Sequence, residues 1–370
     1  MRSVEMSSSV SEAKVDPGFQ DSDSLVAQTS VIIVNFNGGE DLITCIASIR
    51  KTEPKVEVVL VDNASQDGSF QRASARFPGI VGVQSGVNLG FGVGNNLGVQ
   101  HASRELLVFL NPDTIAQEGW LEAMVRPLVE DETVGMVTPK VLLKSDSRRI
   151  NVAGLNVHLS GISTCRGMGV AVQAFDEVEE VASISGVAFA VRREVFDVLG
   201  GFDPEFFLYM EDVDLSLRCW LSGYRCLYVP HPSALHEYTF RLDPEKTFHI
   251  EKGRYQILLK CFTGWTLLAL LPTLLLVEII TWGWVVLLRP RAVLQKLKAY
   301  LWVIKHRIDA YANRDVGLQP DRAASSILLD RLGASLDFKQ LAGPSLARAA
   351  AFVFNPLLKA AAVFARRLGR

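Results

Sequence analysis

Two predominantly apolar runs, rich in β-branched residues, constrain the fold of this chain more than any other feature. The first run covers residues 30–36 and the second covers residues 56–61, and residues 40–51 between them carry apolar side chains at helical spacing. A continuous β-branched run is typical of a strand that is buried on both faces of a parallel sheet. The strand–helix–strand order therefore predicts an α/β sheet that binds ligands at the carboxyl ends of its strands.

Polar residues stand at the ends of three predicted strands. Asn35 and Asp62 lie at the ends of the first two, and Asn111 and Asp113 follow a third strand at residues 105–110. A carboxylate at Asp62 can accept hydrogen bonds from a ribose or a base, while Asn111 and Asp113 offer oxygen ligands to a hard divalent cation. Both aspartates can instead simply cap the helices that follow them, so the local pattern leaves the two roles open.

A glycine-rich stretch at residues 87–98 contains Gly90, Gly92, Gly94 and Gly98. Glycine allows a close approach of the backbone, which a diphosphate-sugar needs, so we expect a loop at this position. The spacing does not match the dinucleotide-binding pattern, and the absence of a Gly-Lys-Ser/Thr sequence excludes a P-loop.

An aromatic-rich segment at residues 202–218 carries three carboxylates, Glu211, Asp212 and Asp214, within four positions. Carboxylates beside apolar surface are unfavourable unless they are hydrogen-bonded, paired or used in chemistry. Arg218 lies four residues after Asp214, within pairing reach on a helix. A well-capped surface helix is the alternative interpretation, but the strand-end residues and the glycine-rich stretch favour a functional site.

Taken together, these stretches resemble the family 2 glycosyltransferases, and among them the bacterial rhamnosyltransferase-type enzymes. The resemblance covers roughly residues 30–238 and implies a GT-A fold, an α/β architecture with a Rossmann-like mixed sheet. It implies inverting transfer of a sugar from a nucleotide-diphosphate donor. The matching stretches are residues 31–37, 61–65, 88–92, 111–114 and 202–218.

The resemblance also implies roles for individual residues. Asp212 matches the catalytic carboxylate, although Asp214 remains an alternative base. Asp113 and Asn111, together with His236, would hold Mg²⁺ or Mn²⁺ against the diphosphate. The expected substrate-binding residues are Asn35, Asp62, Asn88, Gly90, Gly186, Glu211, Asp214 and Arg218. The aromatic residues expected to wall the acceptor site are Phe206, Phe207 and Tyr209.

The implied partners are a nucleotide-sugar and a glycan or lipid-linked acceptor. dTDP-rhamnose is the first choice of donor, and UDP- or GDP-sugars remain open. Two other classes compete: a nucleotidyltransferase, which would carry Arg and Lys in the turn at residues 37–39, and a non-catalytic membrane-associated scaffold. A net charge of −2 argues against a nucleic-acid binder.

The C-terminal third is apolar and basic. Residues 261–288 contain one charged residue, Glu278, and one proline, Pro272, and are long enough to span a bilayer. We expect a pair of membrane-surface or shallowly inserted helices, broken at Pro272, in preference to a true span; a buried helical packing domain is the third alternative. Residues 289–370 carry 15 Lys and Arg against five Asp and Glu, which suits an anionic membrane surface.

We therefore expect three regions. They are a disordered segment at residues 1–28, a GT-A domain at residues 29–245 and a helical, membrane-associated region at residues 246–370. The N-terminus lacks the apolar segment of a signal peptide, and the five scattered cysteines favour a reducing compartment. The expected location is the cytoplasmic face of the plasma membrane.

Overall fold

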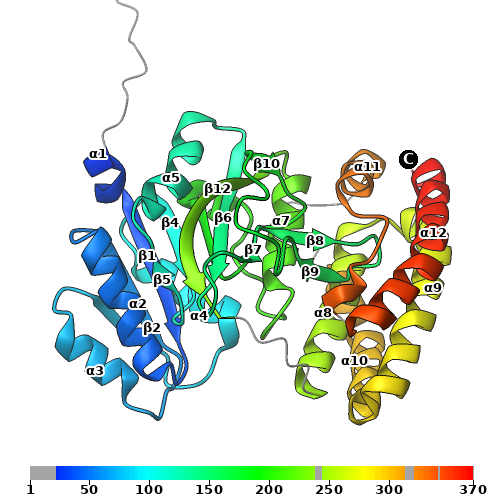
Figure 1. Ribbon diagram of the computed structural model, residues 1–370, viewed down its shortest axis with the longest axis horizontal. Helices are drawn as coiled ribbons and strands as arrows, with labels where there is room; N and C mark the ends of the chain where they lie inside the picture. Colours follow the sequence, from blue (N-terminus) through cyan, green and yellow to red (C-terminus); the bar gives the residue numbers. More distant parts are fainter. Residues whose placement is uncertain (1–21, 238–243, 313–320, 341, 370) are drawn as a thin grey trace, which may run out of the picture.

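The computed structural model describes residues 22–237, 244–312, 321–340 and 342–369. A mixed β-sheet flanked by helices forms the N-terminal part, and a group of helices forms the C-terminal part beside it (Figure 1). The strand order of the sheet is β10-β12-β6-β11-β4-β1-β2-β3. The strands are β1 (Thr29–Asn35), β2 (Glu57–Asp62), β3 (Val81–Gln84), β4 (Leu106–Leu110), β6 (Val134–Leu143), β10 (Glu179–Glu180), β11 (Ala188–Arg192) and β12 (Arg225–His236).

The expected parallel unit is present. β1 pairs in parallel with β2 and β4, and β2 pairs in parallel with β3. β11 runs antiparallel to both β4 and β6 and makes the sheet mixed. The short strands β5 (Ile115–Ala116) and β7 (Ile150–Val152) add to β12 and β6. A separate hairpin, β8 (Leu155–Val157) and β9 (Ser163–Cys165), lies between the sheet and the C-terminal helices (Figure 1).

The helices around the sheet follow the apolar periodicity of the sequence. In α2 (Gly39–Thr52), Leu42, Ile46 and Ile49 are fully buried, as the spacing predicts. The remaining helices of this part are α3 (Ser69–Arg76), α4 (Gly90–His101), α5 (Trp120–Glu130), α6 (Arg193–Val198) and α7 (Glu211–Leu221).

The glycine-rich stretch forms helix α4, and the expectation of a loop was wrong. A Cβ on Gly98 would lie 2.5 Å from the Ile32 side chain, and one on Gly90 would lie 2.1 Å from the carbonyl oxygen of Phe207. The glycines therefore let α4 pack directly against β1 and against the segment that precedes α7. Close helix packing, rather than a cradle for phosphate, explains this part of the sequence.

The N-terminal segment is ordered over its last residues. Residues 22–27, which we expected to be disordered, form α1 (Ser22–Ala27) because the buried Leu25 packs this short helix against α5. The rest of that prediction, residues 1–21, lies outside the described residues.

The C-terminal part contains α8 (Pro244–Cys261), α9 (Gly264–Leu288), α10 (Val293–Ala312), α11 (Arg322–Arg331) and α12 (Pro344–Leu368). α9 is one continuous helix, so the predicted break at Pro272 was wrong. A proline removes a single backbone hydrogen bond, and the packing of α12 along α9 supports the helix. Leu258, Phe262 and Leu270 belong to the same buried core as the sheet, so the two parts share one core.

A buried ion cluster holds the helices together around Glu278. Its carboxylate binds Arg254 of α8 and the hydroxyls of Tyr255 and Tyr300. Lys296 is fully buried, with its Nζ 3.0 Å from Glu251 and 3.4 Å from Glu278. Lys296 is therefore one basic residue of the 289–370 segment that cannot face a membrane surface, because the carboxylates of α8 and α9 hold it inside the protein.

Two of the described helices, α9 and α12, have the length and apolar composition of a membrane span. Most of each lies on the outside of the protein, where large apolar side chains such as Leu275 and Ile279 of α9 and Phe352 of α12 are exposed.

Candidate active site

The polar strand ends meet at one edge of the sheet, as the sequence predicts. Asn35 of β1 is level with Asp62 of β2. The Asn35 side chain is fully buried, and its Nδ2 donates to the hydroxyls of Ser65 and Ser69 at 2.9 Å each. Its Oδ1 accepts the backbone N–H of Gly38 at 3.0 Å. Asn35 therefore organises the turns around Asp62 from within the protein.

A cavity of about 690 Å³ lies beside the N-terminal end of α7. The expected site residues that line it are Asn111, Gly186, Glu211, Asp212 and His236. The expected site residues that do not line it are Asn35, Asp62, Asn88, Gly90, Asp113, Asp214 and Arg218. The predicted site residues therefore lie in different places. Some line the cavity, Asp214 and Arg218 form an ion pair behind it, and Asn35 and Asp62 lie at the carboxyl edge of the sheet.

Asp212 presents its carboxylate to this cavity. Oδ2 accepts the backbone N–H of Gly186 at 2.9 Å, and Oδ1 accepts that of Val213 at 2.8 Å. Burial raises the pKa of Asp212 above the usual range of an aspartate, although the amide hydrogen bonds work in the opposite direction. The carboxylate is therefore held in a fixed orientation, and its affinity for a proton is higher than that of an exposed aspartate.

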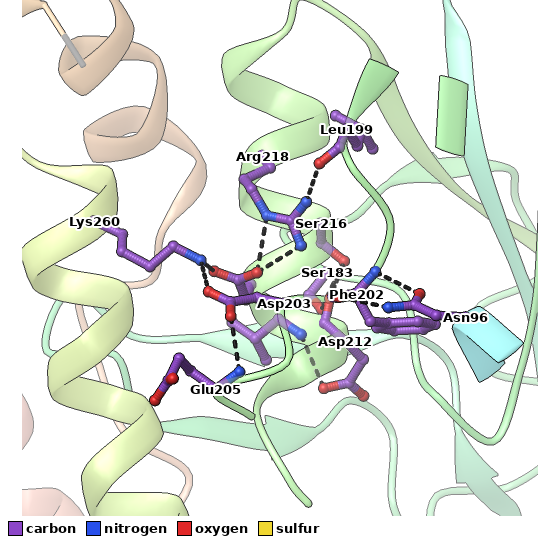
Figure 2. Close-up of polar contacts among 12 residues, drawn as sticks. Asn96, Ser183, Leu199, Phe202, Asp203, Glu205, Asp212, Ser216, Arg218 and Lys260 are labelled. Carbon is purple, nitrogen blue, oxygen red and sulfur yellow. Dashed lines mark hydrogen bonds and ion pairs between the residues drawn. The ribbon is translucent and has the colours of Figure 1, made fainter. Parts of the chain in front are cut away.

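Asp214 lies in a different environment on the same helix turn. Its Oδ2 accepts hydrogen bonds from Arg218 Nε at 2.8 Å and Nη2 at 2.6 Å, and its Oδ1 accepts one from Lys260 Nζ at 2.6 Å. Figure 2 shows Arg218 and Lys260 on the side of α7 away from the Asp212 carboxylate. Burial alone would raise the pKa of Asp214, but the charges of Arg218 and Lys260 hold it below the usual range. Fully buried and doubly paired, Asp214 is unavailable as a base.

Glu211 precedes Asp212 at the start of α7. It is buried, and its Oε2 has no hydrogen-bond partner among the described residues. Burial and the neighbouring charge of Asp212 raise the pKa of Glu211 well above its usual range. Two adjacent carboxylates in one cavity disfavour double ionisation, so this geometry favours a single negative charge on the pair.

A second polar group combines residues from two strand ends. His236, at the end of β12, places its Nε2 3.4 Å from Oδ1 of Asp113, while its Nδ1 lies 3.1 Å from Oδ1 of Asn151. Burial would raise the pKa of Asp113, but the neighbouring imidazole of His236 lowers it. One carboxylate, one imidazole and the nearby amide of Asn111 form a donor set that fits Mn²⁺ or Mg²⁺.

This donor set is incomplete by itself. Among the described residues, no group of three His, Cys, Asp or Glu side chains could hold a metal ion. Oxygen atoms of a bound diphosphate could supply further ligands, as is common where a metal bridges protein and phosphate.

Lys260 is a charged residue behind the site that the sequence analysis did not single out. It comes from α8, 46 residues after Asp214, and its Nζ also binds Oδ2 of Asp203 at 2.6 Å. No local motif marks it, since it reads only as the basic residue that precedes an apolar run. Its side chain fixes the segment before α7 and the first turn of α7 at the same time (Figure 2).

The three aromatic residues expected around the acceptor site have different roles. Tyr209 lines the cavity, but Phe206 is buried in the core and Phe207 packs against Gly90. Only one of the three therefore lies where an acceptor could contact it. Tyr209 and Met210 both have positive φ angles, of 64° and 73°, so the backbone turns sharply into α7.

Comparison with known proteins agrees with this geometry. Residues 30–200 match the family model described as glycosyl transferase family 2. These residues therefore form a glycosyltransferase family 2 domain. This match favours sugar transfer over the nucleotidyltransferase alternative.

Curated relatives include rhamnosyltransferases. The N-acetylglucosaminyl-diphospho-decaprenol L-rhamnosyltransferase of Mycobacterium tuberculosis is 28% identical over 266 residues, which cover 64% of this chain and 85% of the relative. Rhamnosyltransferase WbbL of Escherichia coli is 26% identical over 221 residues, 55% of this chain and 82% of the relative. Within its family this glycosyltransferase is therefore similar to the rhamnosyltransferase-like subgroup.

Solved structures support the GT-A fold. The structure of GalNAc-T7 with UDP, GalNAc and Mn²⁺ superposes with a TM-score of 0.53 at 20% identity and covers 64% of this chain and 48% of that one. Residues 1–349 of S. aureus TarS superpose with a TM-score of 0.50 at 14% identity, covering 92% of this chain and 91% of that one. Both likenesses concern the fold alone.

Proposed function

We propose that this glycosyltransferase moves rhamnose, with inversion, from a nucleotide-diphosphate donor to a hydroxyl of a lipid-linked cell-envelope glycan. The observation that carries the proposal is the Asp212 carboxylate, held by two backbone amides in a cavity that it shares with His236. The named activities of the M. tuberculosis and E. coli relatives support the choice of rhamnose.

In the proposed reaction Asp212 acts as the base. It accepts the proton of the acceptor hydroxyl while the oxygen bonds to the anomeric carbon. The bond between that carbon and the diphosphate oxygen breaks on the opposite face, and the nucleoside diphosphate leaves. The amides of Gly186 and Val213 keep the carboxylate in place, and its raised pKa strengthens its attraction for the proton.

Asp113, His236 and Asn111 would hold Mg²⁺ or Mn²⁺ beside the diphosphate. A divalent cation supplies charge stabilisation for the leaving phosphate. GalNAc-T7, which shares this fold, was solved with Mn²⁺, and this supports a metal at the site. Asn151 would orient His236 through the hydrogen bond at Nδ1.

The nucleoside would lie along the outer sheet edge at Asp62. Asn35, Asn88 and Gly90 would support this edge from inside the protein. Asn88 Oδ1 accepts the backbone N–H of Gly90 at 3.0 Å, and Asn35 Oδ1 accepts that of Gly38. The donor sugar would lie near Gly186, whose amide contacts the base. dTDP is the first choice of nucleotide, with UDP and GDP as the alternatives.

We assign the enzyme to the cytoplasmic face of the plasma membrane as a peripheral or monotopic protein. The exposed apolar sides of α9 and α12 and the excess of positive charge in residues 289–370 support this location. A membrane position would bring the site to an acceptor that is carried by a lipid.

The direct test replaces the base. Asp212→Asn keeps the size of the side chain and one acceptor oxygen for the two backbone amides but removes the proton acceptor, so transfer from dTDP-rhamnose should fall by at least 10²-fold. Thermal shifts with dTDP and Mn²⁺ should stay close to those of the natural protein. Full transfer by the variant would move the base elsewhere.

The scaffold alternative has its own test. Incubation of the purified protein with dTDP-, UDP- and GDP-sugars and Mn²⁺ should release a nucleoside diphosphate slowly from the preferred donor even without an acceptor. A protein that binds none of these donors and hydrolyses none would support a non-catalytic role.

A further inference from the structure

We propose that the cavity holding Asp212 continues into a hydrocarbon-binding groove between α9 and α12, which receives the lipid chain of the acceptor. The inference rests on the proposed function for the identity of the acceptor, but the groove is argued from the structure. It extends the site beyond the sugar-transfer chemistry to a separate subsite for the lipid.

The first observation is that the active-site cavity is continuous with the space between α9 and α12. One cavity is lined both by the polar group of the active site and by apolar side chains from the C-terminal helices. Its apolar lining includes Ile280, Trp284 and Leu287 of α9 and Leu346, Ala350 and Phe354 of α12. A ligand with a polar end at Asp212 and an apolar end between these helices matches this distribution.

The second observation concerns Gly283, near the C-terminal end of α9. Its position lines the cavity, and a Cβ built there meets no atom within 4 Å. Glycine weakens a helix interior relative to alanine. Gly98 allows a tight contact with Ile32, whereas a side chain at Gly283 would enter open space. The missing side chain instead leaves the groove open.

The third observation is a positive charge between the two ends. Lys246, Ile250 and Arg254 of α8 follow one another at four-residue spacing, and all three line the cavity. Arg254 is already bound to Glu251 at 2.8 Å and to Glu278. Lys246 lies in the first turn of α8, and its Nζ is 4.7 Å from the centre of the ring of Tyr209, two residues before the carboxylate pair Glu211 and Asp212. It can attract an anionic group that joins a glycan to a lipid.

The fourth observation is that leucine side chains at the rim of the cavity are exposed. Leu287 and Leu288 at the end of α9 and Leu346 at the start of α12 line the cavity and are exposed, between 43% and 79% of each. These side chains give a hydrocarbon chain an apolar path between the groove and the outer faces of α9 and α12. A chain lying there would bury apolar surface on both helices, which stabilises the bound state.

The test uses the full-length protein and farnesyl phosphate, a single hydrocarbon chain with an anionic head, below its micelle concentration. Binding is measured by isothermal titration calorimetry, with inorganic phosphate as the head group alone. Gly283→Trp fills the groove and should weaken farnesyl phosphate binding at least tenfold. Leu275→Trp adds an indole to the same helix at an exposed position outside the cavity lining and should change binding less than twofold.

A second variant guards against misfolding. Ala350→Trp fills the groove from α12 and should weaken binding to a similar extent, with circular dichroism and the melting temperature as checks on the fold. Equal binding by the natural protein and both groove variants would overturn the proposal, as would equal binding of farnesyl phosphate and inorganic phosphate. No donor is present, so the result stands apart from whether the protein transfers rhamnose.

Discussion

Lys260 of α8 and Asp214 of α7 form a buried ion pair, with Nζ 2.6 Å from Oδ1. The pair joins the C-terminal helices to the acidic turn that carries Asp212. Because Lys260 also binds Asp203, one ammonium group fixes both the segment that enters α7 and the helix itself. The helical region is thereby part of the structure that positions the active site.

Replacement of Lys260 by methionine should destabilise the protein by about 2–4 kcal/mol, because the carboxylates of Asp203 and Asp214 would lose a buried cation. Urea unfolding of the variant measures the change. Lys51→Met removes an exposed lysine and should change the free energy of unfolding by less than about 0.5 kcal/mol. A loss for Lys260→Met as small as that of the control would contradict the role of the pair.

The rate of transfer should fall on the acid side at a higher pH than an ordinary aspartate would give. A base acts in its ionised form, and burial raises the pKa of Asp212, so the midpoint of the acid limb should lie above the pKa of an ordinary aspartate. The pH profile of kcat/KM measures this limb. An acid limb at or below pH 4 would mean that the base is an ordinary exposed aspartate or another group.

Removal of the metal should abolish transfer, and the loss should depend on two residues. EDTA should stop the reaction, and added Mn²⁺ should restore it. Asp113→Ala and His236→Ala should each reduce the thermal shift that dTDP produces with Mn²⁺, because they remove the two side chains that meet at 3.4 Å. His101→Ala, at an exposed histidine, is the matched control. An unchanged shift in both variants would place the metal elsewhere.

The ion cluster around Glu278 should contribute to the stability of the helical region. Lys296→Met would leave the carboxylates of Glu251 and Glu278 with Arg254 as their remaining cation. We expect a loss of about 3 kcal/mol in the free energy of unfolding. Lys298→Met, two residues further along α10 and exposed, should have little effect. Similar unfolding curves for the two variants would show that the cluster is dispensable.

Several features of this protein follow from the sequence alone. The parallel strands could be predicted because continuous β-branched runs suit strands that are buried on both faces. The meeting of Asn35 and Asp62 at one sheet edge then follows from the parallel pairing. The acidic turn at Glu211–Asp214 could be recognised because carboxylates within an apolar segment are unfavourable without a partner or a use.

Tertiary structure decided what local spacing could not. The spacing of Arg218 already offers a partner to Asp214, but only the fold brings Lys260 from a distant helix to complete that pairing while Asp212 faces the cavity. The glycines of α4 suggest a loop in the sequence, but in the fold they let the helix pack against β1 and against the segment before α7. The sequence suggests that Lys296 is solvent-exposed, but in the fold it is buried beside Glu251 and Glu278. In each case the deciding partner is far away in the chain, so its effect on burial and charge exists only in the folded protein.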